Sequence, residues 1–68
     1  MSSAVLSDDS VRAMLDFRAA HTMSQKTLDK LCSFPENTVK RLEQQTLAPT
    51  SDQLEILNRV LNVELTLE

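Results

Sequence analysis

Glycine is absent from this 68-residue chain, which also has no tryptophan or tyrosine and only one cysteine and one histidine. Loops that cradle phosphates need glycine, because the backbone must approach the phosphate without a Cβ atom in the way. This absence excludes the glycine-rich nucleotide-binding folds. Cys32 alone cannot form an internal disulfide, and together with His21 it falls short of a structural zinc site. We therefore expect no metal, no cofactor and a reducing compartment such as the cytoplasm.

Long apolar runs and catalytic side chains are also missing. No run approaches the roughly 18 to 20 apolar residues of a membrane span. The start MSSAVLSDDS lacks the basic region and the long apolar region of a signal peptide. One histidine, one cysteine and no glycine-lined loop leave no credible set of nucleophile, base and oxyanion donors. We expect a soluble cytoplasmic protein that binds no membrane and is not an enzyme.

The residues that are present favour helices packed on helices. Hydrophobic residues make up 41% of the chain and charged residues 25%, and the two phenylalanines are the only aromatic residues apart from the histidine. A core of Leu, Val, Ile, Met and Ala suits a compact all-α fold. Residues 1–68 correspond to one domain, near the lower size limit for a core without disulfides, metals or a partner subunit. Oligomerisation is therefore expected.

The first helix is predicted from about Asp8 to about His21. Ser7 can cap it, and two aspartates follow in the first turn, where the helix dipole favours negative charge. His21 lies in the last turn, and we assign it a structural role. The inward stripe has three-to-four spacing and consists of Val11, Met14 and Phe17, with Ala13 and Ala20 beside them.

The second and third helices are predicted on either side of a short turn. Ser24 can cap a helix from about Gln25 to Cys32, whose inward residues are Leu28 and either Leu31 or Cys32. Proline is tolerated only in the first turn of a helix, so the third helix should begin at Pro35 and run to about Gln44. Ser33 and Glu36 could form its capping box. The residues it would bury are Phe34, Val39 and Leu42.

A loop over residues 44–51 leads to the fourth helix. Thr50 or Ser51 can cap this helix, and Asn62 can end it in the left-handed conformation. Its apolar face comprises Leu54, Leu57, Val60 and Leu61. Residues 63–68 alternate apolar and polar, which is typical of a short strand with one covered face and requires a pairing partner. A fifth helical turn is the alternative for this tail.

Four motifs follow one another along the chain: Met-Ser-Gln at 23–25, Thr-Val-Lys-Arg-Leu-Glu at 38–43, Pro-Thr at 49–50 with Leu54, and Leu-Asn-Val-x-Leu at 61–65. In this order and spacing, the chain resembles the Cro/C1-type (Xre-like) helix-turn-helix domains of the lambda-repressor-like family over about residues 11–65. The resemblance implies a four- to five-helix domain with an arm at 1–7, a helix-turn-helix core at 24–44 and a C-terminal tail at 62–68.

The resemblance also implies that the partner is double-stranded DNA, contacted in the major groove. The side chains that would face bases are Glu36, Asn37, Thr38, Lys40 and Arg41. Those that would contact phosphates are Ser24, Gln25, Lys26, Gln44 and Thr46. Arg18 and Glu43 would form a structural ion pair between the first and third helices. Taken singly, the charged residues of this set fit a solvated helix face better than a base contact.

The sequence departs from the family pattern at three places. Asp29 stands where the family usually has alanine, so its carboxylate must find a partner or tilt outward. Ser33 and Gln45 replace glycines, and we expect the backbone to avoid left-handed angles there. The loop after the third helix has no lysine or arginine, which predicts weak binding to phosphates.

Two functions remain open. Residues 23–46 hold four basic and three acidic side chains, whereas the rest of the chain holds three basic and seven acidic ones. The leading hypothesis is a sequence-specific DNA-binding regulator that represses transcription as a homodimer, paired through Val63, Leu65 and Leu67. The alternative is a protein interaction module of the same fold, which binds a toxin, a polymerase subunit or another regulator through its acidic surface and exposed leucines.

Overall fold

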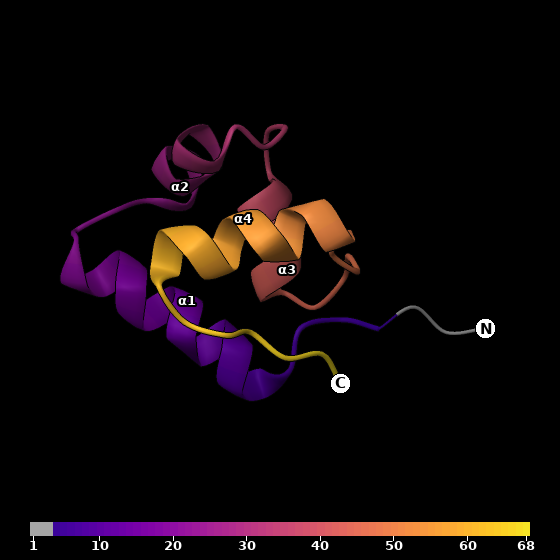
Figure 1. Cartoon of the computed structure of the whole chain (residues 1–68). Helices are drawn as coiled ribbons and strands as arrows, with labels where there is room; N and C mark the ends of the chain where they lie inside the picture. Colours follow the sequence, from indigo (N-terminus) through magenta and orange to yellow (C-terminus); the bar gives the residue numbers. More distant parts are fainter. Residues whose placement is uncertain (1–3) are drawn as a thin grey trace.

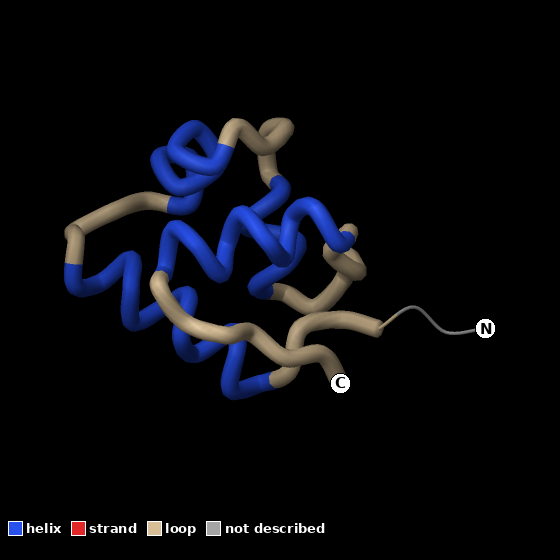
Figure 2. Tube along the Cα trace, in the orientation of Figure 1, coloured by secondary structure: helices blue, strands red, loops and turns tan. Residues whose placement is uncertain are grey.

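A computed structural model describes residues 4–68 and is all-helical, as predicted. Its helices are α1 (Asp8–Ala20), α2 (Gln25–Cys32), α3 (Thr38–Glu43) and α4 (Ser51–Leu61). Within the described residues, Figure 2 shows helices joined by loops and no strand. None of these helices is long and apolar enough to cross a membrane.

Three helices begin at the N-caps that the sequence predicts. The side-chain oxygens of Ser7 and Ser24 accept the backbone N–H groups three residues further on, at the starts of α1 and α2. Thr50 caps α4 and forms a capping box with Gln53, since each side chain bonds to the other residue's backbone. These local bonds satisfy N–H groups that have no partner within their own helix.

All four helices are followed within two residues by a residue in the left-handed conformation, and none of these residues is glycine. The residues are Thr22, Ser33, Gln45 and Asn62, with φ between 49° and 59°. After α1, α2 and α3, two backbone bonds close the Schellman motif, in which the N–H following the left-handed residue reaches back five positions. The expectation that Ser33 and Gln45 avoid left-handed angles is therefore wrong. The hydrogen bonds of the motif hold the strained backbone in place.

The start of α3 also differs from the prediction. The helix begins at Thr38, three residues after Pro35, and ends at Glu43. The predicted capping box of Ser33 and Glu36 does not form, because Ser33 is the left-handed residue that closes α2. Asn37 lies at the N-cap position with φ 68°, and its own side chain makes no capping bond.

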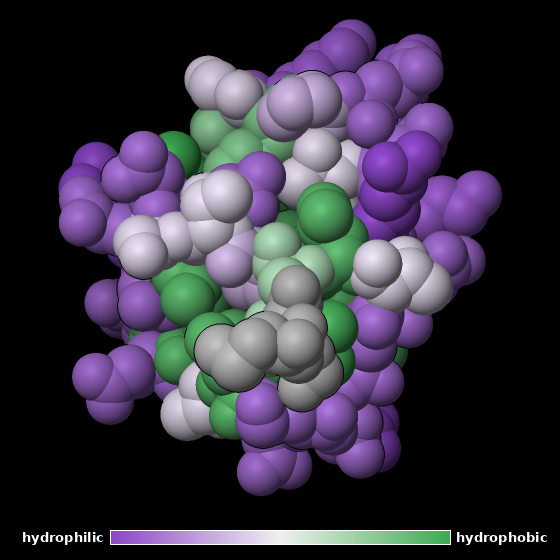
Figure 3. All heavy atoms as spheres, turned by 90° about the vertical axis from the view of Figure 1, so that its right-hand side faces the viewer, coloured by the Kyte–Doolittle hydropathy of each residue, from purple (hydrophilic) through white to green (hydrophobic). Residues whose placement is uncertain are grey.

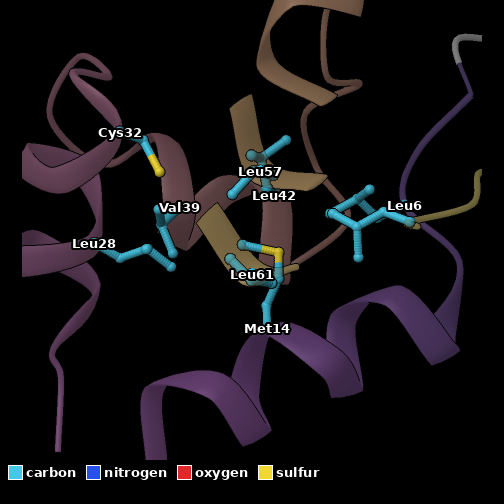
Figure 4. Packing of buried hydrophobic residues seen from close by; sticks show 9 residues of the cluster. Leu6, Met14, Leu28, Cys32, Val39, Leu42, Leu57 and Leu61 are labelled. Atoms are coloured by element: carbon cyan, nitrogen blue, oxygen red, sulfur yellow. The ribbon is translucent and has the colours of Figure 1, made fainter. Parts of the chain in front are cut away.

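The core is a single cluster of aliphatic side chains drawn from every helix. Figure 4 shows Met14 of α1 pointing into the same cluster as Leu42, Leu57 and Leu61. On α2 the inward residue after Leu28 is Cys32, whereas Leu31 is 54% exposed. The phenyl ring of Phe17 lies 4.4 Å from the ring of His21, which gives this histidine a packing role at the end of α1.

The tail is neither a strand nor a fifth helical turn, and its partner is the N-terminal arm of the same chain. Leu6 and Leu67 form an isolated antiparallel bridge, flanked by backbone bonds from Ser7 to Thr66 and from Glu68 to Val5. The arm and the tail accordingly lie side by side in Figure 1. Leu6 is fully buried, so the arm contributes a core residue that the sequence pattern does not indicate.

The face at the right of Figure 1, toward which the last residues of the tail point, is shown in Figure 3. Hydrophobic residues gather in the middle of this face and hydrophilic residues surround them. The predicted site lies on the α2–α3 unit. This unit is held in place by contacts of α3 with α1 and of α2 with α4.

Candidate nucleic-acid interface

Asp29 joins α2 to α3. Its Oδ1 accepts the backbone N–H of Val39 at 2.8 Å, and its Oδ2 accepts that of Asn37 at 3.0 Å. The residue is 4% exposed. A carboxylate is stable at this depth because both oxygens are hydrogen-bonded. Asp29 therefore performs the capping that the Asn37 side chain does not, and it fixes the position of α3 relative to α2.

The structure brings Arg18 and Glu43 together in a bidentate pair. Nε of Arg18 donates to Oε2 of Glu43 at 2.8 Å, and Nη2 donates to Oε1 at 2.9 Å. The side chains are 19% and 5% exposed, respectively. Nη1 of Arg18 also donates to the carbonyl of Met23 at 3.3 Å, so the pair ties α1 to both the start of α2 and the end of α3.

Gln25 belongs to the same network. Its Nε2 donates to Oε1 of Glu43 at 2.8 Å, which makes that oxygen an acceptor for two donors. From the sequence, Gln25 is predicted to contact phosphate only. Its amide nitrogen carries a second hydrogen that this bond does not use. Gln25 can therefore serve the network and a ligand at the start of α2 together.

Four of the five predicted base-contacting residues are exposed at the start of α3: Glu36, Asn37, Lys40 and Arg41. Thr38 is different, because it is 5% exposed and its hydroxyl donates to the carbonyl of Pro35 at 2.7 Å. The structure therefore removes Thr38 from the side chains that can reach a base. Its physical role is to close the turn before α3.

A hollow of about 270 Å³ separates the starts of α2 and α3. Its lining is polar and comprises Gln25, Lys26, Asp29, Glu36, Asn37 and Lys40. Two predicted phosphate-contacting residues and three predicted base-contacting residues therefore share one concave surface. The oxygens of Asp29 are already used in capping α3, which leaves the outer side chains of this surface for a ligand.

The remaining predicted phosphate contacts lie outside this hollow. They are Ser24, Gln44 and Thr46, and all three are exposed. The hydroxyl of Ser24 caps α2 by accepting from the backbone of Thr27 at 3.1 Å, and the hydroxyl of Thr46 donates to the carbonyl of Arg41 at 3.3 Å. A hydroxyl group has one donor and two acceptor positions, so these bonds leave both hydroxyls able to form a further hydrogen bond.

Burial of two carboxylates changes the electrostatics of this segment. Asp29 is capping α3 and Glu43 is neutralised by Arg18, so neither lies at the surface. The exposed charges of residues 23–46 are then Lys26, Lys30, Lys40 and Arg41 against the single carboxylate of Glu36. At the surface itself four cations therefore accompany one carboxylate, while the Asp29 carboxylate lies beneath them.

The three predicted dimerisation residues differ in their exposure to solvent. Leu65 is 8% exposed and belongs to the core of its own chain, so it is not available to a second copy. Val63 and Leu67 are 42% and 40% exposed. The bridge to Leu6 lies between two backbone hydrogen bonds made by the neighbouring residues. The N–H and C=O groups of Leu67 therefore point away from the arm.

The buried cysteine is not placed as a reactive thiolate. Cys32 is buried, and burial together with the nearby Asp29 carboxylate raises the pKa of its thiol, which disfavours the reactive thiolate. Within residues 4–68, no group of three His, Cys, Asp or Glu side chains could hold a metal ion. Every buried side-chain nitrogen and oxygen in the same range has a hydrogen-bond partner.

Comparison with family models, with curated proteins and with solved structures finds no match for this chain.

Proposed function

We propose that this protein is a sequence-specific DNA-binding regulator of transcription, which places α3 in the major groove and represses as a homodimer by covering a promoter. The proposal rests on one observation above all. The exposed surface of the α2–α3 unit presents four cations and one carboxylate, because Asp29 and Glu43 are buried in structural contacts. Exposed cations are what binding to the phosphate backbone requires.

The exposed side chains have complementary roles in this proposal. The Asn37 amide can pair with adenine, Arg41 or Lys40 with guanine, and the Glu36 carboxylate can accept from the amino group of cytosine. These residues are all exposed at the start of α3 or in its first turns. Lys26, Ser24 and Gln25 at the start of α2, with Gln44 and Thr46 after α3, would hold phosphates on either side.

Rigidity of the unit supports the same proposal. Asp29 holds the start of α3, and Glu43 holds its end against Arg18 and Gln25. A helix of only six residues is fixed at both ends by side chains of other elements. Base contacts need side chains on a backbone whose position is set before binding, because ordering them on binding reduces affinity.

The homodimer is part of the proposal and concerns the outer edge of the tail. The outward-facing N–H and C=O of Leu67 could pair antiparallel with those of a second copy, beside the exposed Leu67 side chain. A two-fold axis there would place two α3 helices on successive turns of one DNA face.

The test is selection of bound duplexes from a randomised DNA pool at low salt, followed by sequencing and a salt titration of the selected site. We expect a two-fold symmetric motif with half-sites about one helical turn apart. Lys26→Ala should weaken all sequences alike and reduce the salt slope by about one. Arg41→Ala should cost about 1–3 kcal/mol and relax the preference at one position.

At Asn37 the substitution that tests base contact is glycine. Its φ of 68° would penalise alanine through the backbone alone, whereas Asn37→Gly removes the amide and keeps the left-handed conformation available. Arg12→Ala, on the exposed surface of α1, is the matched loss of one cation outside the site. Selection without enrichment, or equal losses from Arg12→Ala and Arg41→Ala, would count against DNA recognition and favour the protein interaction module.

A further inference from the structure

A groove of about 250 Å³ lies between α1 and the C-terminal tail. Its walls are residues 63–66 of the tail and, on α1, Asp9, Ser10 and Ala13. It shares no residue with the hollow between α2 and α3. Any ligand of this groove is therefore separate from the proposed DNA contact.

Hydrogen bonds fix the shape of the groove. The Ser10 hydroxyl donates to the carbonyl of Thr66 at 2.9 Å and accepts its backbone N–H at 2.7 Å, which holds the tail at a set distance from α1. The N–H of Leu65 is held by the side chain of Asn58 at 2.9 Å. The tail wall is thus tied to both α1 and α4, and the groove exists before any ligand binds.

The groove combines an apolar interior with an acidic margin. Ala13 is partly buried, Leu65 belongs to the core, and Val63 is 42% exposed beside them. The carboxylates of Asp9 and Glu64 are exposed, and neither forms an ion pair within residues 4–68. An aliphatic side chain fits the interior, and cations fit the two carboxylates. DNA and anionic lipid surfaces would be repelled.

We propose that this groove binds a segment of a second, different protein in which aliphatic residues alternate with lysine or arginine. A second copy of this chain is disfavoured as the occupant. A two-fold contact would set Asp9 and Glu64 against the same residues of the other copy, and like charges placed together oppose association. The basic α2–α3 surface of one copy could also dock into the groove of another copy. Such a head-to-tail contact would build an open chain of molecules unless the copies closed into a ring.

The first experiment maps the site with a defined probe. The full chain, labelled with ¹⁵N, is titrated with a short peptide of alternating lysine and leucine, and with a second peptide of alternating glutamate and leucine. We expect saturable shifts at the amides of residues 9–13 and 63–66 with the lysine peptide, and none with the glutamate peptide. Saturation at other residues, no saturation, or equal binding of both peptides would overturn the proposal.

Two double variants separate a specific site from general attraction to an acidic protein. Asp9→Lys with Glu64→Lys changes the groove, and Asp52→Lys with Glu55→Lys changes α4 by the same charge. Asp9 and Asp52 both lie in the first turn of a helix. Each double variant therefore loses one favourable interaction between an acidic side chain and the dipole of its helix. We expect the groove pair to weaken peptide binding about tenfold or more and the α4 pair to leave it within about twofold.

Equal weakening by the two pairs would show general electrostatic attraction and overturn the proposal. Circular dichroism melting confirms that each variant is folded. Glu64→Gln, which alters one exposed side chain, provides a milder variant that should still weaken binding by several-fold. Light scattering of the unmodified chain distinguishes self-association: a dimer that dissociates only in the groove variants would assign the groove to a second copy instead.

Discussion

The Asp29 carboxylate accepts the backbone N–H of Val39 at 2.8 Å, so a side chain of α2 caps the beginning of α3. The first N–H groups of a helix have no partner inside the helix, and a capping side chain usually comes from the residue just before it. Here that residue, Asn37, makes no such bond. The capping bond therefore also connects two helices, and the start of α3 moves with α2.

Replacing Asp29 tests this connection. Asp29→Ala leaves the N–H groups of Asn37 and Val39 without their acceptor, at a cost of about 1–3 kcal/mol for each group that stays buried. Asp29→Asn keeps one good acceptor and should lose about half as much. Urea unfolding gives the free energies. Asp16→Ala, an exposed acid on α1, is the control and should change stability by less than about 0.5 kcal/mol. A similar loss from both alanines would contradict the capping role.

The ion pair of Arg18 and Glu43 should stabilise the fold far more than the exposed pair of Arg59 and Glu55. Glu43→Ala leaves the Arg18 guanidinium, which is only 19% exposed, without its main acceptor. We expect a loss of about 3 kcal/mol, the lower end of the range for a buried pair. Glu55→Ala removes a pair whose side chains are both 74% exposed and should cost less than about 1 kcal/mol. Thermal melting of the two variants makes the comparison.

Glycine should stabilise two of the left-handed helix ends. Thr22 and Ser33 have φ of 49° and 59°, and both are exposed. Thr22→Gly and Ser33→Gly should each raise stability by about 1 kcal/mol, with the larger effect at the β-branched threonine. Calorimetry would show this as a rise in Tm of about 4–8 °C.

Gln45 provides the contrast. Its Nε2 donates to the carbonyl of Leu6 at 2.8 Å and to the Asp8 carboxylate at 2.9 Å, so glycine would relieve the backbone and remove both bonds. Gln45→Gly should be neutral or destabilising. A gain at Gln45 equal to the gain at Ser33 would mean that these side-chain bonds contribute nothing.

The Cys32 thiol should react slowly in the folded protein. Burial raises the pKa of this thiol, and the nearby Asp29 carboxylate raises it further. Because the folded pKa is the higher one, the thiol's contribution to stability is complete below the unfolded pKa and is lost as the pH rises through the folded value. Iodoacetamide labelling at mildly alkaline pH should be at least about tenfold slower in buffer than in urea. Equal rates would contradict the burial of Cys32.

Leu67→Pro tests the proposed dimer without disturbing the bridge inside the chain. The flanking bonds use Ser7, Thr66, Glu68 and Val5, so proline removes the outward N–H of residue 67 and its exposed leucine side chain but none of these bonds. We expect light scattering to show a dimer for the unmodified chain and a monomer of unchanged helicity for the variant. Deletion of the whole tail is a poorer test, because Leu65 is a core residue. A dimer that survives Leu67→Pro must form elsewhere.

The parts of the fold that the sequence predicts depend on residues close together in the chain. The caps Ser7, Ser24 and Thr50 bond to groups three residues away, and such signals are visible in the sequence. The apolar spacing likewise gives the inward faces of α1 and α4, except that Ala20, predicted beside the inward stripe of α1, is exposed. The bounds of α2 agree with the prediction at both ends.

The features that the sequence does not predict depend on contacts between separate elements. Asp29 is hydrogen-bonded to groups eight and ten residues further on, across a turn whose geometry the residue types do not specify. The arm and the tail pair between Leu6 and Leu67, which are 61 positions apart in the sequence, and no local pattern reveals such a pairing. At the candidate site, the set of side chains follows from the resemblance to helix-turn-helix domains, but the burial of Thr38 follows from the turn alone.

The uneven distribution of charge between the α2–α3 surface and the rest of the molecule has a consequence for how it moves in an electric field. Residues 23–46 carry four basic and three acidic side chains and the remaining residues three and seven, so we expect the positive end of the molecular dipole on the side of the α2–α3 surface. Near a polyanion the molecule would turn this end forward before contact, while its acidic end would oppose the reverse orientation. An acidic protein with a pI of about 5.0 can in this way approach a negatively charged partner in one preferred orientation.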